Sequence, residues 1–185
     1  MNSYAKLIAA AAAVLVVAIG GSQFLPREWG PGGANATPPP SPVLLARGSF
    51  VIRDWNKVDF EATRQGSSVT GRMTVGQKGG TSDFLRVDLR CARTTEDGLI
   101  MIGGYTDGGG GRFAGVRDGT LAAIVLKRGS PVKAQIWFGS LLNAPGTQTR
   151  DCLAYLDASL TQSRTSLPGD DWLRDDIGGT IEFGP

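Results

Sequence analysis

The sequence predicts an all-β fold, an antiparallel sandwich or small barrel of about nine strands, preceded by one N-terminal transmembrane or signal-anchor helix. Three observations lead to this fold class. Short apolar runs alternate with polar residues at a period of two. The 27 glycines gather between these runs, where they suit tight turns. One long uncharged segment stands near the amino terminus of the 185-residue chain, which is long enough for one domain with appendages.

Residues 1–25 are expected to form a signal anchor or transmembrane helix. Residues 7–19 carry no charged side chain, and Lys6 precedes them. With its flanks the segment has about 20 residues, the length of a helix that spans the hydrocarbon core of a bilayer. Its shorter apolar centre also fits a cleaved secretory signal peptide. A retained anchor is preferred because apolar residues resume near Leu25 and Trp29 follows at an interfacial position.

The anchor predicts a single-pass protein of the cell membrane, with Lys6 inside and the C-terminal domain extracytoplasmic; secretion after signal cleavage is the alternative. Residues 26–45 are rich in proline and glycine and show no period of 2 or 3.6. This composition is typical of an extended spacer. The extracytoplasmic β domain is therefore expected over residues 46–185.

Strands are expected where apolar residues recur at alternate positions between turn residues. The clearest strand is residues 84–91, which places Cys91 on the inward face with the strand's leucines and valine. Residues 99–102 form an apolar run that suits a strand buried on both faces. Asp118 and Gly119 predict a turn before the next strand. The other expected strands are residues 48–52, 58–62, 69–75, 112–116, 120–126, 132–138, 152–156 and 179–183, with residues 153–160 left open between strand and helix.

Cys91 and Cys152 predict a disulfide. An even pair of cysteines behind an export-type segment usually pairs in an oxidising compartment. The alternative is two separate buried thiols that behave as small hydrophobic side chains. A redox role is not expected, because neither cysteine belongs to a Cys-x-x-Cys motif.

Composition excludes several classes of chemistry. Histidine is absent, which rules out Ser-His-Asp and Cys-His catalysis and any zinc site that includes histidine. Two cysteines are too few for a four-thiolate zinc or iron–sulfur site. From Val43 onward the chain holds 17 basic and 16 acidic residues, interspersed along most segments, so nucleic acid is not an expected partner. We expect no catalytic, cofactor-binding or metal-ligating residue and no cofactor.

Three local patterns have two interpretations each. Residues 103–111 contain six glycines, as a phosphate-binding loop does, but a strand-like segment follows, so a flexible hairpin tip is preferred. Asp107 and Asp118 are the candidates for hydrolysis by a carboxylate pair, although no spacing in the sequence points to a partner acid. Four aspartates supply oxygen ligands for calcium, but their spacing is not that of an EF-hand, and a solvated turn or short helix is preferred. These aspartates are Asp170, Asp171, Asp175 and Asp176.

The aromatic residues Trp55, Trp137, Trp172 and Tyr105 either line a groove or belong to the core, and the core is the commoner place for scattered aromatics. The order of short motifs along the chain resembles a group of uncharacterised bacterial exported β-domain proteins, actinobacterial or Chloroflexi-like, with a single N-terminal membrane anchor. The motifs are residues 48–50, 69–71, 87–91, 97–104, 113–118 and 151–152, with the leader residues 4–9 and 24–26. The resemblance implies an exported β domain with a paired cysteine, and it brings no catalytic residues.

The expected function is a non-enzymatic binding or interaction module, tethered to the membrane by its N-terminal helix. The expected ligand is an envelope protein, a glycan, or a small molecule held in a barrel mouth. A cell-envelope hydrolase that uses acidic residues and a structural stalk element are the alternatives.

Overall fold

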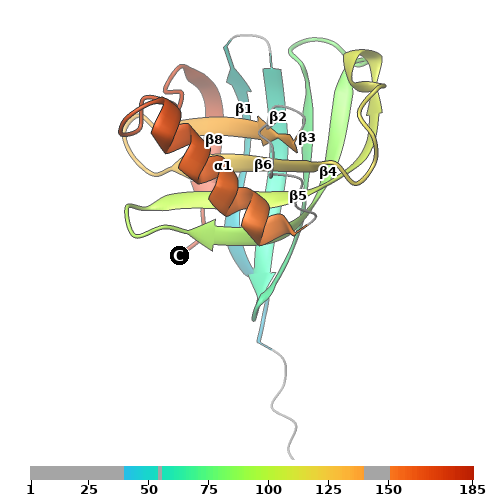
Figure 1. Ribbon diagram of the computed structural model, residues 1–185. Coiled ribbons are helices and arrows are strands. Elements are labelled where there is room, and N and C mark those ends of the chain that lie inside the picture. Colours follow the sequence, from blue (N-terminus) through green and yellow to red (C-terminus); the bar gives the residue numbers. More distant parts are fainter. Residues whose placement is uncertain (1–39, 54–55, 140–150) are drawn as a thin grey trace, which may run out of the picture. The chain divides into compact units, whose positions relative to one another are not determined.

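A computed structural model describes residues 40–53, 56–139 and 151–185. They form a mostly antiparallel β domain with eight strands in a nearly closed, barrel-like sheet, one α-helix and one short 3₁₀ helix (Figure 1). The strands are β1 Val43–Ile52, β2 Asn56–Gln65, β3 Ser68–Gln77, β4 Phe84–Thr94, β5 Leu99–Gly110, β6 Leu121–Lys127, β7 Lys133–Phe138 and β8 Ile177–Phe183. The helices are η1 Gly111–Phe113 and α1 Cys152–Ser166.

Each strand from β1 to β6 pairs with the next along the chain, and β8 returns to pair with β1, so the order is β7-β6-β5-β4-β3-β2-β1-β8. All these pairs are antiparallel. The edge strand β7 is joined by an isolated bridge to the segment just before the other edge strand, β8, where Ala134 and Arg174 exchange hydrogen bonds of 2.8 and 2.9 Å. The sheet is therefore a barrel with a seam between β7 and β8.

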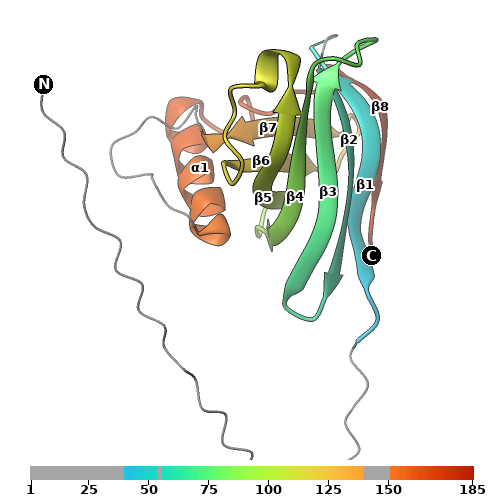
Figure 2. The same ribbon diagram turned by 90° about the vertical axis from the view of Figure 1, so that its right-hand side faces the viewer.

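Two apolar layers hold the domain together. One fills the inside of the barrel, and the other lies between the outer face of the sheet and α1. Figure 2 shows α1 beside that outer face. Residues of β5 alternate between the layers, with Leu99 and Met101 on the outside and Ile100 and Ile102 on the inside. This confirms the expected strand with two buried faces. Each buried side chain of this size contributes roughly 1.5–3 kcal/mol to folding.

The cysteine pair ties α1 to the sheet. Cys91 in β4 and Cys152 at the start of α1 lie at disulfide distance, with their Cα atoms 6.0 Å apart, as the sequence predicted. The expected inward position of Cys91 is wrong. The pairing of β4 with β5 shifts register between Leu89 and Cys91, so Leu89 points into the barrel and Cys91 points out towards the helix. A β-bulge of this kind adds one residue and re-aims the side chains that follow it.

The strand expected at residues 152–156 is wrong, because this segment begins α1. Asp151 precedes the helix in an extended conformation, and its carboxylate accepts a hydrogen bond of 2.8 Å from the N–H of Ala154, as a helix N-cap does. Cys152, Tyr155 and Leu156 are buried, a spacing of three and four residues that places them on one helix face. The domain is mostly β rather than all-β.

Three other expectations need correction. The described residues form eight strands where about nine were expected, and residues 112–116 belong to η1 and a turn. Residues 103–111 are not a hairpin tip, because β5 continues through them to Gly110. A Cβ on Gly103 would lie 3.2 Å from both cysteine sulfurs, so this position lets the helix approach the sheet. The domain begins earlier than expected, since β1 starts at Val43; the predicted helix of residues 1–25 and most of the predicted linker lie outside the described residues.

Candidate functional site

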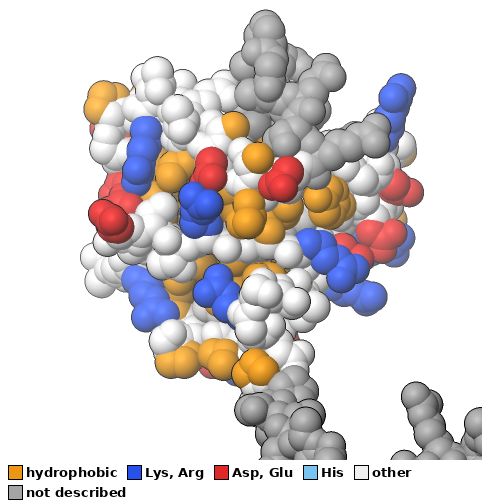
Figure 3. All heavy atoms as spheres, turned by 60° about the horizontal axis from the view of Figure 1, so that its bottom comes forward, with side chains coloured by type: hydrophobic (Ala, Val, Ile, Leu, Met, Phe, Trp, Pro, Cys, Tyr) orange, Lys and Arg blue, Asp and Glu red, His pale blue; other side chains and the backbone are white. Residues whose placement is uncertain are grey.

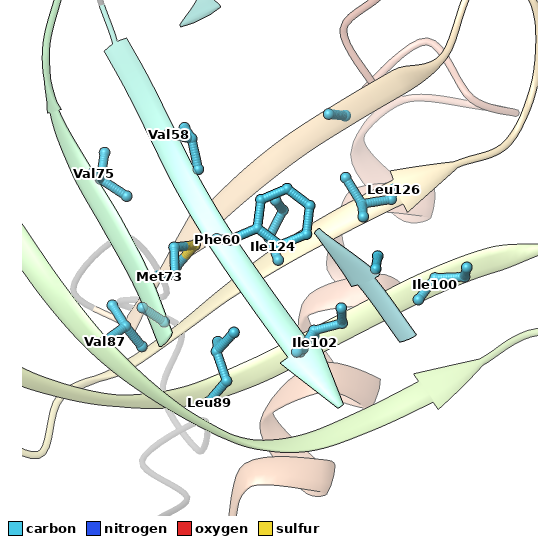
Figure 4. Packing of buried hydrophobic residues seen from close by; sticks show 14 of the residues in the cluster. Val58, Phe60, Met73, Val75, Val87, Leu89, Ile100, Ile102, Ile124 and Leu126 are labelled. Carbon is cyan, nitrogen blue, oxygen red and sulfur yellow. The ribbon is translucent and has the colours of Figure 1, made fainter. Parts of the chain in front are cut away.

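Apolar side chains pack the interior of the barrel (Figure 4). Phe50 and Phe60 meet edge to face, with ring centroids 6.0 Å apart, an arrangement that aromatic rings favour. Met73 and Ile124 are fully buried beside them. Because the interior is filled, a ligand site has room only at the ends or on the outer face of the barrel.

One end of the barrel carries an apolar hollow of about 580 Å³, which we call the open end. It is the lower end in Figure 1, where β1 begins. Figure 3 brings this end forward and shows hydrophobic side chains beside those of Lys and Arg. The lining residues come from the start of β1, the end of β2, the β2–β3 and β4–β5 turns, the segment after β6, and the last residue: Pro40, Ser41, Val43, Leu44, Leu45, Arg64, Gly66, Thr94, Gly98, Ile100, Arg128 and Pro185.

Two arginines give the open end its charge. Arg128 is held in place, because its guanidinium donates to the carbonyl oxygen of Gly184 and lies 5.1 Å from the ring centroid of Phe183. Arg64 is half-buried and makes no ion pair within the described residues. No acidic side chain belongs to the described lining. The open end therefore combines apolar walls with positive charge, which suits an anionic amphiphile better than a cationic one.

The opposite end is covered by η1, and we call it the closed end. Arg112 of η1 donates a hydrogen bond of 2.7 Å to the side-chain oxygen of Asn56 and lies 3.7 Å from a carboxylate oxygen of Asp83. The ring of Phe113 packs against that of Phe138, with centroids 6.4 Å apart. These contacts fix η1 across this end of the barrel.

The glycine-rich segment is used for structure. The N–H of Gly108, which a phosphate loop would offer to an anion, donates a hydrogen bond of 2.8 Å to the carboxylate of Asp118. The carbonyl oxygen of Asp107 accepts from Arg86 at 3.1 Å. Asp118 is thus occupied in holding the turn before β6, where the sequence predicted one.

The four aspartates near the C-terminus lie in the turn between α1 and β8. Asp170 pairs with Lys127, and Asp176 lies 3.5 Å from the guanidinium of Arg174. Within the described residues, no three His, Cys, Asp or Glu side chains gather closely enough to hold a metal ion. The structure thus uses two of the four carboxylates in ion pairs.

Two of the four aromatic candidates come together. The rings of Trp137 and Trp172 stack with centroids 5.5 Å apart, and both line a groove beside α1. Tyr105 packs in the same outer layer but does not line that groove, and Trp55 lies outside the described residues. The two interpretations of the tryptophans are both partly met, because these rings are buried and also form the floor of a groove.

No protein-family model, curated protein or solved structure matches the chain. In the stretches 40–53, 56–139 and 151–185, no helix has the length and hydrophobicity of a membrane span, and the predicted anchor lies outside them.

Sequence reasoning missed the residues of the open end. Val43 and Leu44 fell within the predicted linker, and Arg64 and Arg128 follow predicted strands without any motif. They meet only because the start of β1, the end of β2 and the segment after β6 lie at the same end of the barrel. The one local signal was the apolar run Val43–Leu45 next to the proline-rich spacer.

Proposed function

We propose that the domain is a non-enzymatic binding module that takes the apolar part of an anionic amphiphile into its open end. We further propose that residues 1–25 tether it to the extracytoplasmic face of a membrane. The observation that carries the proposal is the combination, in one hollow, of apolar walls with two arginine side chains and no acidic side chain among the described lining.

The size and exposure of the open end support this function. Its volume of about 580 Å³ lies in the range of ligand pockets. Val43 on its rim is 47% exposed, which is unusual for a large aliphatic side chain in this domain. A bound hydrocarbon chain would cover such surface, and each methylene removed from water contributes about 0.8 kcal/mol.

The place where the chain enters the domain also supports it. Pro40 and Ser41 line the hollow, so the spacer reaches the domain at the rim of the open end. A proline-rich spacer of about 15 residues extends over roughly 45 Å at most. A tether of that reach would keep the open end near the membrane, where amphiphiles with a long apolar chain are concentrated.

Photo-crosslinking tests the proposal. The full chain is placed in phosphatidylcholine vesicles that contain a trace of palmitic acid with a diazirine at its chain end, and labelled peptides are mapped by mass spectrometry. We expect label on the peptides that contain Val43–Leu45 and Ile100, and we expect excess unlabelled palmitate to remove it.

Val43→Glu and Leu153→Glu form a matched pair. Leu153 is 43% exposed on α1, so both substitutions put a carboxylate on an exposed aliphatic position. Val43→Glu should reduce labelling by about tenfold or more, because an acidic group in an apolar hollow costs upward of about 1.4 kcal/mol. Leu153→Glu should leave it unchanged. Equal labelling of the two variants, or label spread evenly over the domain, would overturn the proposal.

A further inference from the structure

A second hollow, of about 440 Å³, lies on the outside of the barrel between the C-terminal half of α1 and β7. We call it the α1–β7 groove. It shares no lining residue with the open end. Its polar lining residues are Arg53 from the β1–β2 turn, Asn56 at the start of β2, Gln135 from β7, and Gln162, Ser163 and Ser166 from α1. The apolar side chains of Ile52, Ile136, Phe138 and Leu167 also line it. Trp137 and Trp172 lie at its floor.

The two halves of α1 present different chemistry to the sheet. The N-terminal half packs Cys152, Tyr155 and Leu156 into the outer apolar layer. On the same helix face, one to three turns later, Leu160 still packs against this layer, while Ser159, Gln162, Ser163 and Ser166 bring hydroxyl and amide groups. The C-terminal half of this helix face is therefore more polar than the N-terminal half.

Two buried hydroxyls lie at the junction of these halves. Tyr155 is 2% exposed and Ser159 is 1% exposed, and neither hydroxyl has a hydrogen-bond partner of acceptable geometry within the described residues. Burial raises the pKa of Tyr155, so its phenol stays protonated and remains a donor. A buried hydroxyl left unpaired costs about 1–3 kcal/mol. Neither hydroxyl belongs to the described lining of the groove.

The floor of the groove is fixed by hydrogen bonds. The indole N–H of Trp172 donates to the carbonyl oxygen of Gly169 at 3.0 Å, and the amide of Gln135 donates to the carbonyl oxygen of Trp172 at 3.0 Å. The same Gln135 accepts from the N–H of Ile136 at 3.1 Å. By contrast, the side chains of Gln162 and Ser166 make no hydrogen bond to any other described residue. The floor residues are therefore held by hydrogen bonds within the protein, whereas the side chains of Gln162 and Ser166 are available to bind a ligand.

We propose that the α1–β7 groove binds a glycan chain. A sugar ring has an apolar C–H face and a rim of hydroxyls that both donate and accept. The groove matches it with the apolar side chains of its lining and with amide and hydroxyl groups, which likewise do both. Arg53 is the single charged side chain of the described lining, so an ionic ligand has little to pair with. The hydrocarbon tail assigned to the open end would leave these wall groups unpaired.

The test uses the full chain in lipid nanodiscs with its four tryptophans replaced by 5-fluorotryptophan. The probes are the trisaccharides of N-acetylglucosamine, glucose and mannose, followed by ¹⁹F NMR. We expect at least one trisaccharide to shift the signals of Trp137 and Trp172 saturably. Assignment by single Trp→Phe variants separates the four signals.

Gln162→Ala and Thr161→Ala are the matched variants. Gln162 faces the groove, whereas the exposed hydroxyl of Thr161 bonds back to the carbonyl oxygen of Asp157 at 2.9 Å. Gln162→Ala should weaken binding about fivefold, the loss of about one hydrogen bond, and Thr161→Ala should not. Absence of a saturable shift with all three trisaccharides, or equal weakening in both variants, overturns the glycan site. Neither result bears on palmitate labelling of the open end.

Discussion

The two ends of the barrel are built differently. At the closed end, η1 lies across the barrel with Arg112 bonded to Asn56 and Phe113 packed on Phe138. At the open end, an apolar hollow remains, and Arg128 braces its edge by bonding to the carbonyl oxygen of Gly184.

The lengths of the connections explain the difference. Between Gly110 at the end of β5 and Leu121 at the start of β6 the chain has ten residues, enough to form η1 and return. At the open end, two residues join β2 to β3 and four join β4 to β5. Gly66, with a φ of 60°, makes the shorter turn. Connections this short cannot reach across a barrel, so the open end stays uncovered by them.

The packed interior that separates the two ends should show the largest effect. Phe50→Ala removes a fully buried ring that packs on Phe60, and we expect a loss of about 3–5 kcal/mol in the free energy of unfolding. Urea denaturation measures it. A loss below about 1 kcal/mol would mean that the interior is loosely filled and that the hollow of the open end extends into it.

Removing the disulfide should lower stability without changing either end. In the double variant Cys91→Ala/Cys152→Ala, a link across a sequence separation of 61 residues is lost, and the chain-entropy model gives a cost of up to about 4 kcal/mol. Denaturation of oxidised wild type and of the variant gives the difference. Palmitate labelling of the folded variant should match that of wild type, because the disulfide lies on the outer face; a large drop in labelling would contradict this independence.

The closed end should depend on Arg112. Arg112→Gln removes the hydrogen bond to Asn56 and the ion pair with Asp83, and we expect a loss of about 1–2 kcal/mol together with faster amide exchange in η1. Arg72→Gln is the control, because Arg72 is almost fully exposed on β3. If Arg112→Gln and Arg72→Gln were equally stable, the contacts of Arg112 would not be what holds η1 at the closed end.

At the open end, charge should affect binding more than stability. Arg64→Gln should change the free energy of unfolding by less than about 0.5 kcal/mol and reduce palmitate labelling about threefold, as loss of a solvent-screened ion pair does. Labelling by the corresponding alcohol should not change. Lys78→Gln removes an equal charge from the β3–β4 turn and should leave both probes unaffected. If Arg64→Gln reduced labelling by the acid and by the alcohol equally, the Arg64 side chain would contribute through packing against the ligand and not through its charge.

The smallest effect is expected at Asp97, in the β4–β5 turn. A hydrogen bond from Thr95 and the guanidinium of Arg164, 2.6 Å away, hold the pKa of Asp97 below its usual value. Its carboxylate therefore stabilises the fold above the unfolded-state pKa, and this contribution is lost as the pH falls through the lowered pKa. Asp97→Asn should cost no more than a few tenths of a kcal/mol at pH 7, because both side chains are 44% exposed. A cost that persisted in acid below that pKa would have another origin.

Most strands could be predicted from the sequence, because alternation of apolar and polar residues is a local consequence of the pleat. The run at residues 99–102 even indicated burial on both faces. The same method failed at residues 152–156, where a short apolar run suits a strand or a helix equally. Asp151 was the helix signal there, since an aspartate before residues spaced three and four apart is typical of an N-cap.

The candidate sites were less predictable. For Trp137 and Trp172 the core was the preferred interpretation and a groove the alternative, both from residue type alone. The bulge after Leu89 that turns Cys91 towards α1 is not visible in the sequence pattern. Arg64 and Arg128 stand 64 positions apart in the sequence and face one hollow only through the closure of the sheet.

The sequence by itself determined the β class, the absence of histidine chemistry and the pairing of Cys91 with Cys152, because composition and period-two alternation need no knowledge of distant contacts. Only the tertiary structure decided which residues share an end of the barrel. That choice depends on how the sheet curls and where short connections leave it uncovered, and both follow from packing between strands that lie far apart along the chain.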